Sequence, residues 1–247
     1  MGEFTLPSSL FSVEGRYYRS VFCLALDTTT PGGSCAVMRD DLVLRERAGD
    51  RDRPHDARLP RDLMAVLEDA RVALDDIDVF AVATGPGSFT GLRIGIATMQ
   101  GLAFSAGKPL IGVSGFDALA RAAGHAPLVA IATWVDAWRG EVFAARYEHG
   151  LEVESPTVEP PAALLRRIGM PTVFIGDGAS VHASLISAAL GDRARFAEPP
   201  APLLAGTIAL IALESAASGD LPQPDAIRPL YVRRPDAELA RDARPVP

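Results

Sequence analysis

The most specific stretch of the sequence is a glycine-rich turn, Gly-Pro-Gly-Ser-Phe-Thr-Gly-Leu-Arg at residues 85–93. Glycines permit positive φ and close backbone approach, and Ser88 or Thr90 can cap the helix predicted to follow. Exposed amides at the start of that helix could attract an anion. The turn lacks the Lys-Ser/Thr of a Walker loop and the third glycine of a dinucleotide fingerprint. The spacing therefore favours a structural strand-to-helix turn over a phosphate cradle.

Side chains that could ligate a metal or act as nucleophiles stand apart from one another. The histidines are isolated in the sequence: His55, His125, His149 and His182. None of them forms a pair with the spacing of a zinc-binding helix. Ser88 lacks the surroundings of a nucleophile elbow. We therefore predict no catalytic residue and no metal site.

The composition excludes several classes of protein. Of 247 residues, 48% are hydrophobic and 22% are charged, and 24 Lys and Arg against 31 Asp and Glu give a formal charge of -7. This sign does not suit a protein that grips a nucleic-acid backbone unaided. Cys23 and Cys35 lie in apolar runs, where reduced, buried thiols are expected. With no apolar run near the roughly 18 residues of a membrane helix, and no secretory signal, a cytoplasmic protein without membrane contact is expected.

The hydrophobic pattern predicts the same order of elements twice. Strands are predicted in the first half at 21–27, 34–38, 42–47, 78–84 and 110–113, and helices at 56–74 and 90–105. Strands are predicted in the second half at 128–135, 141–147, 151–157 and 172–175, and helices at 162–167 and 180–189. A long apolar helix at 203–217 follows. Because strands separated by helices pair in parallel and strands joined by tight turns pair antiparallel, the pattern predicts an α/β protein with two mixed sheets.

These elements suggest a division of the chain into four parts. Residues 1–20 have no hydrophobic period and are expected to be a flexible extension. Residues 21–122 form a first lobe, and 123–202 a second, smaller lobe. Residues 203–247 form a C-terminal helix and tail that could pack back on the first lobe.

The helix predicted at 90–105 carries an unusual number of small residues. Gly91, Gly95 and Thr98 lie on it at helical spacing, and each interior glycine costs about 1 kcal/mol of helix propensity. Close approach of another helix would offset this cost. That helix could belong to the same lobe or to another subunit, and the sequence leaves both possibilities open.

Several motifs resemble the TsaB (YeaZ) family, a subunit of the bacterial machinery that makes threonylcarbamoyladenosine in tRNA. The resemblance is carried by residues 84–114, which contain the glycine-rich turn and end in Gly-Val-Ser, and by Leu-Ala-Leu-Asp-Thr-Thr at 24–29. Further matches are Val-Asp-Ala at 135–137, Gly-Asp-Gly at 176–178 and Pro-Leu-Tyr-Val-Arg at 229–233. Together they span residues 21–235 in the expected order.

The resemblance implies a fold and a set of partners. The fold would be actin-like, of the sugar-kinase and Hsp70 type, with two RNase H-like lobes in tandem. The chain would be a non-catalytic partner of the TsaD transferase in forming N6-threonylcarbamoyladenosine at position 37 of ANN-decoding tRNAs. A TsaE-like ATPase would join the pair, tRNA would be met only through the complex, and a homodimer could form when the chain is alone.

The resemblance also places the pairing surface on the two helices of the first lobe. The residues expected to contact a partner there are Leu59, Leu63, Leu67, Gly91, Leu92, Gly95, Thr98 and Met99.

The same fold leaves an alternative function open, that of an ATP-dependent phosphotransferase. A kinase of this fold needs aspartates near magnesium and a glycine-bearing phosphate turn in each lobe. The candidates for this site are Asp27, Thr28, Gly85, Gly87, Ser88, Asp136, Gly176, Asp177 and Gly178. Because Pro31 stands where a backbone amide would meet phosphate, we expect a degraded nucleotide site. No resident cofactor is therefore predicted, although ATP and magnesium could bind at a partner boundary.

Overall fold

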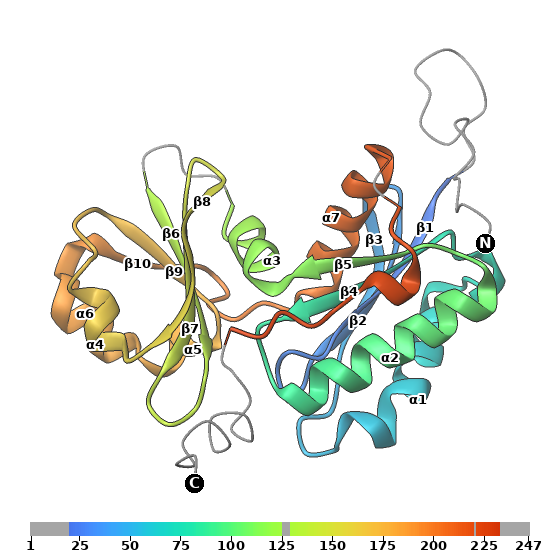
Figure 1. Cartoon of the computed structure of the whole chain (residues 1–247), viewed down its shortest axis with the longest axis horizontal. Coiled ribbons are helices and arrows are strands. Elements are labelled where there is room, and N and C mark those ends of the chain that lie inside the picture. The colour runs from blue at the N-terminus through green and yellow to red at the C-terminus, as the bar shows by residue number, and fades with distance from the viewer. Residues whose placement is uncertain (1–19, 125–128, 220, 233–247) are drawn as a thin grey trace, which may run out of the picture.

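The computed structural model describes residues 20–124, 129–219 and 221–232, which form two five-stranded sheets with helices packed on their faces (Figure 1). The first sheet contains β1 (Phe22–Asp27), β2 (Ser34–Arg39), β3 (Leu42–Ala48), β4 (Val79–Gly85) and β5 (Leu110–Ser114). The second contains β6 (Ala130–Asp136), β7 (Val142–Glu148), β8 (Leu151–Glu159), β9 (Thr172–Ile175) and β10 (Ala194–Phe196). The two sheets account for the duplication predicted from the sequence.

Helices connect and cover the strands. The α-helices are α1 (His55–Ala70), α2 (Phe89–Ala106), α3 (Gly115–Ala122), α4 (Pro161–Leu165), α5 (Asp177–Val181), α6 (Ala183–Leu190) and α7 (Ala205–Ala217). The described residues also include the short 3-10 helices η2 (Leu74–Asp76), η3 (Gly191–Arg193) and η4 (Pro224–Ala226). No helix in the described ranges is long and apolar enough to cross a membrane.

The two sheets share one topology. The strand order is β3-β2-β1-β4-β5 in the first and, read from its opposite edge, β8-β7-β6-β9-β10 in the second. In each sheet the first three strands are antiparallel and the later two pair in parallel. The predicted fold class, an α/β protein with two mixed sheets of RNase H-like topology, is confirmed.

Strand β1 shows why its sequence is apolar without a break. Cys23 and Ala25 point to the side covered by α7, whereas Leu24 and Leu26 point to the side covered by α1 and α2. A strand buried on both faces needs no polar alternation. Both predicted buried thiols, Cys23 and Cys35, are free and buried.

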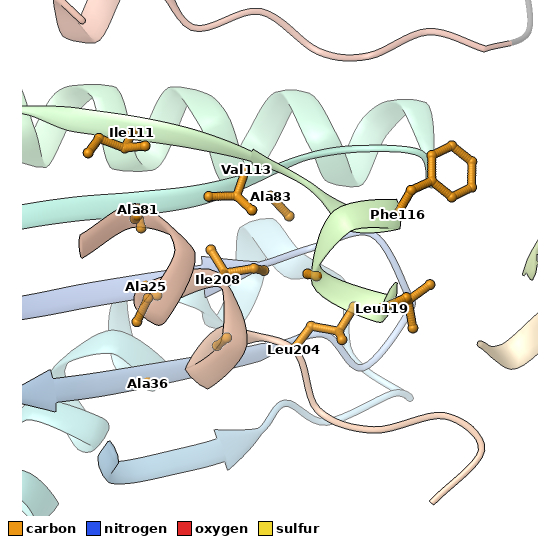
Figure 2. Close-up of a cluster of buried hydrophobic side chains, with 14 of the residues drawn as sticks. Ala25, Ala36, Ala81, Ala83, Ile111, Val113, Phe116, Leu119, Leu204 and Ile208 are labelled. Carbon is orange, nitrogen blue, oxygen red and sulfur yellow. The ribbon is translucent and has the colours of Figure 1, made fainter. Parts of the chain in front are cut away.

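Helix α7 packs closely on the first sheet, although it follows β10 of the second sheet in the sequence. Figure 2 shows Ile208 near Ala25 and Ala81, and Leu204 near Leu119. The small side chains of the alanines in β1, β2 and β4 allow the helix to approach the sheet. We call the first sheet with α1, α2 and α7 the first lobe.

The start of α7 is capped by the first sheet. The amides of Leu204 and Ala205 donate to Ser34 Oγ at 3.3 and 3.0 Å, and the amide of Gly206 donates to Glu46 at 2.8 Å. Side chains from β2 and β3 thus satisfy the free N–H groups of a helix that lacks its own cap.

Several predicted boundaries are corrected. The helix predicted at 56–74 ends at Ala70 because Arg71 adopts a left-handed conformation with φ 57°. The helix predicted at 180–189 is divided into α5 and α6 at His182. Helix α3 and strand β10 were not predicted. Residues 1–19, most of the predicted extension, and 233–247, most of the predicted tail, lie outside the described residues.

Candidate functional site

The glycine-rich turn is packed against the loop that follows β1. The Ser88 amide donates to the Thr29 carbonyl oxygen at 3.2 Å, and a Cβ on Gly87 would lie 2.5 Å from the same oxygen. Ser88 caps α2 as predicted, since its Oγ accepts from the Gly91 amide at 3.3 Å. Two amides that could face a phosphate are therefore used inside the chain, and the geometry favours the structural reading of this turn.

Asp27, at the end of β1, and Asp177, at the start of α5, both accept hydrogen bonds from backbone amides. Asp27 is buried and accepts hydrogen bonds from the Thr29 amide at 2.8 Å and the Thr29 hydroxyl at 2.7 Å. Asp177 accepts from the amides of Asp136 at 3.0 Å and Gly178 at 2.9 Å. Burial raises the pKa of Asp27 and of Asp177 because each carboxylate loses hydration, and the negative charge of Asp177 raises that of Asp27 further.

A cavity of about 220 Å³ lies between the two sheets beside these carboxylates. Asp27, Gly176 and Asp177 line it, whereas the other six candidates for a nucleotide site do not. Arg51 and Ser34, which the sequence did not single out, also line it. Small-molecule sites usually occupy about 300–1,000 Å³, so the cavity is small for a nucleotide.

A buried arginine fastens the loop after β1. The Arg58 guanidinium donates to the carbonyl oxygens of Pro31, at 3.2 Å, and of Gly32, and it pairs with Asp62. Its side chain is only 4% exposed. The carbonyls of this loop thus face a cation of the chain itself. Sequence reasoning missed Arg58 because it stood among several exposed arginines and aspartates.

His55 completes this clamp. Its Nδ1 lies 3.0 Å from the Arg58 guanidinium, which can only donate, so Nδ1 must accept and Nε2 must carry the proton. Nε2 then donates to the Thr30 carbonyl oxygen at 3.1 Å. Burial and the charge of Arg58 lower the pKa of His55, so the neutral form is favoured.

Seven of the eight residues predicted to contact a partner are buried inside the first lobe. They are Leu59, Leu63, Leu67, Gly91, Leu92, Gly95 and Met99, while Thr98 is partly buried. The leucines and Met99 belong to the core between α1, α2 and the sheet. A Cβ on Gly95 would overlap the Thr28 side chain, and one on Gly91 would lie 2.5 Å from the Thr28 carbonyl oxygen. The predicted contact residues are therefore corrected, because these glycines admit the chain's own loop.

The opposite side of the same two helices is exposed. On α2, Ala97 and Gly101 are exposed, Phe104 is 82% exposed, and a Cβ on Gly101 would meet nothing within 4 Å. On α1, Arg61 and Met64 are exposed. We call these five residues the outer helix face. In Figure 1 the two helices lie side by side on the same face of the first sheet.

A C-terminal strap, residues 221–232, runs along the other flank of α2. Gln100 Nε2 donates to the carbonyl oxygens of Pro224 at 2.8 Å and Ile227 at 3.3 Å. The Leu230 amide donates to the Thr84 carbonyl oxygen at 2.7 Å. The chain's own later segment thus covers one flank of α2 and leaves the outer helix face open.

Two RNase H-like sheets in tandem, with a cleft between them, define a protein of the actin-like class. The solved structure of Acidaminococcus fermentans (R)-2-hydroxyglutaryl-CoA dehydratase component A supports this fold. It aligns over 80% of this chain and 100% of its own length, with 12% sequence identity and a TM-score of 0.57.

The family described as TsaD, tRNA N6-adenosine threonylcarbamoyltransferase, matches residues 49–241. An uncharacterized Mycobacterium tuberculosis protein is 35% identical over 217 residues, 87% of this chain and 93% of that protein. The Bacillus subtilis tRNA threonylcarbamoyladenosine biosynthesis protein TsaB is 31% identical over 177 residues, 69% of this chain and 77% of TsaB. The structure of Pseudomonas aeruginosa YeaZ is 28% identical, covers 85% of this chain and 99% of its own, and superposes at a TM-score of 0.67. The chain belongs to the TsaB (YeaZ) family, within the wider TsaD family.

Proposed function

We propose that this chain acts in threonylcarbamoyladenosine biosynthesis as a non-catalytic partner of a TsaD-type transferase. It docks through the outer helix face, and the resulting pair engages a TsaE-like ATPase and meets tRNA as a complex. When the transferase is absent, the same face supports a homodimer. The names of the Bacillus subtilis and Escherichia coli relatives support the pathway.

The outer helix face is the observation that carries the docking proposal. Ala97 and Gly101 leave a low, open strip on α2 that leads to the exposed Phe104, and Met64 is exposed on the neighbouring α1. An exposed apolar patch next to small residues lets a foreign helix approach closely and bury the larger side chains. A partner helix laid along this strip would cover all four residues.

The cleft supports a role without catalysis. Asp27 and Asp136, which a phosphotransferase of this fold would direct at magnesium, accept hydrogen bonds from the amides of Thr29 and Trp138. Asp177 likewise accepts from the amides of Asp136 and Gly178. The Ser88 amide, which would face phosphate, donates to Thr29. Groups that already hydrogen-bond within the folded chain are not free to stabilise a transferring phosphoryl group.

The second candidate function is an ATP-dependent phosphotransferase acting at the same cleft. The cavity favours it, since two carboxylates, Asp27 at the end of β1 and Asp177 at the start of α5, line one opening. Its volume and the loop hydrogen bonds weigh against it. We therefore favour the docking role over the phosphotransferase function.

Reconstitution of tRNA modification tests the proposal. Threonylcarbamoylation of tRNA by the cognate transferase and ATPase should require this chain. The Asp27→Asn variant should support the reaction at the wild-type level, because the carboxylate has no chemical role. Undiminished modification when the chain is omitted would refute the proposal, and loss of modification with a folded Asp27→Asn chain would favour catalysis by the cleft.

A further inference from the structure

Three side chains from distant parts of the sequence meet at the start of α2. The rings of Phe89 and Tyr231 stack with centroids 5.3 Å apart and an interplanar angle of 27°. The Arg93 guanidinium lies 3.8 Å from the Phe89 ring centroid, and its Nε donates to the Tyr231 hydroxyl oxygen at 2.9 Å. We call these three residues the aromatic–arginine cluster.

The cluster is preorganised and yet open to solvent. Phe89 and Arg93 are one turn apart on α2, and Tyr231 follows directly after Leu230, which is bonded to β4. The buried Ile227 further anchors the strap on which Tyr231 lies. Even so, Phe89 is 41% exposed, Tyr231 is 39% exposed, and Arg93 is exposed. Rigid aromatic and arginine side chains at a surface are the types that dominate binding energy at interfaces.

The cluster continues the outer helix face. Phe89, Arg93, Ala97 and Gly101 occupy successive i, i+4 positions and so form one ridge of α2. A helix lying over Ala97 and Gly101 would bring neighbouring parts of the same partner to Arg93.

The hydrogen-bond donors of the cluster that remain available suit a carboxylate. Among the described residues Arg93 makes no ion pair, and its one hydrogen bond uses Nε. The two terminal nitrogens of a guanidinium match the two oxygens of a carboxylate. The rings of Phe89 and Tyr231 hold the guanidinium and lower the entropy that it would lose on pairing.

We propose that the aromatic–arginine cluster of Phe89, Arg93 and Tyr231 is an anchor for an aspartate or glutamate side chain of the transferase that docks on the outer helix face. This inference rests on the proposed function. A stacked arginine could also receive a nucleobase and phosphate of RNA. The net charge of -7 opposes that use, because long-range repulsion would weaken the encounter with RNA.

The test is a binding titration of the full-length chain with the cognate transferase at two salt concentrations. We expect Arg93→Gln and Tyr231→Ala each to weaken binding about tenfold or more, as loss of an interface anchor does. Arg93→Lys should recover only part of the affinity, because an ammonium keeps the charge without the planar fork. The salt dependence of binding should fall in Arg93→Gln. Arg195→Gln, which removes an exposed arginine on β10, is the matched control and should bind normally.

The outcomes separate this inference from the proposed function. Wild-type affinity in folded Arg93→Gln, together with lost binding in Ala97→Arg, would overturn the anchor and leave the docking role intact. Wild-type affinity in both variants would overturn the docking role as well. Unchanged transferase affinity with reduced crosslinking of tRNA to the assembled complex would assign the cluster to RNA and overturn the anchor.

Discussion

Gly95 of α2 lies directly against Thr28 of the loop after β1. A Cβ on Gly95 would be 3.1 Å from the Thr28 Cβ and 3.0 Å from its Cγ2, and it would overlap Oγ1. Thr28 is fully buried, and its Oγ1 has no hydrogen-bond partner among the residues that the structure describes. The missing side chain at Gly95 therefore makes room for a loop of the same chain, whereas Ala97 and Gly101 of the same helix face outward and are exposed.

The two interior glycines of α2 should respond oppositely to alanine. Gly95→Ala should lower the free energy of unfolding by about 1–3 kcal/mol, because the new methyl group overpacks a buried site. Gly101→Ala should raise it by about 0.5–1 kcal/mol, because alanine favours the helix and the site is open. Urea denaturation measures both changes. If Thr28→Ala does not partly restore the stability of Gly95→Ala, the proposed steric cause is wrong.

Arg58 should be far more important for stability than its exposed neighbour on α1. Arg58→Ala should lower the free energy of unfolding by about 3 kcal/mol, because it removes the hydrogen-bond partner of Asp62 and of the Pro31 and Gly32 carbonyls. Arg61→Ala should change stability by less than about 0.5 kcal/mol because that side chain is exposed. Thermal and urea unfolding compare the two variants, and equal effects would contradict the clamp.

The His55 clamp predicts a pH dependence of stability. The folded protein lowers the pKa of His55 below its ordinary value of 6.5, so the unfolded chain binds the proton more readily. The stabilisation is therefore complete above pH 6.5 and is lost as the pH falls through 6.5 toward the lowered folded value. The side chain introduced by His55→Gln cannot titrate. The difference in unfolding free energy between the wild type and this variant should therefore shrink as the pH falls from 7.5 to 5.5. A difference in unfolding free energy that stays constant over this range would contradict the assignment.

The cleft should bind Mg-ATP weakly or not at all when the chain is alone. Its loop amides and carboxylates already have partners in the first loop and at Asp177. Isothermal titration calorimetry on the isolated chain measures the binding. Tight binding that Asp27→Asn abolishes would favour the phosphotransferase instead.

The sequence predicted the strands better than the surfaces. The apolar run through Leu24 and Leu26 and the turn at Asp40 define β1 to β3 because local pattern and burial agree. Helical spacing also identified Leu59, Leu63 and Leu67 as one face of α1. Spacing cannot say what covers such a face, and the chain's own sheet does so here. Ala97 and Gly101 were not among the predicted contact residues, because small, exposed residues give no hydrophobic period.

The sequence suggested that the C-terminal segment could pack back on the first lobe, but the particular contacts of the strap and of Arg58 were not predicted, for a different reason. Tyr231 meets Arg93 across 138 positions of the chain, and Arg58 binds backbone carbonyls, which cannot be read from side-chain types. The doubled order of elements was visible because each sheet takes all its strands from one continuous part of the chain, whereas contacts between distant segments appear only in the folded structure.

Docking through the outer helix face is the central claim, and a sedimentation titration of the chain with its cognate transferase tests it most directly. Ala97→Arg places a long, charged side chain on the open strip, and Ala188→Arg places the same side chain at an exposed helical alanine of α6. We predict that Ala97→Arg abolishes the heterodimer at concentrations where Ala188→Arg and the wild type form it fully, with unchanged melting temperatures. A heterodimer that forms equally well with Ala97→Arg would contradict the account.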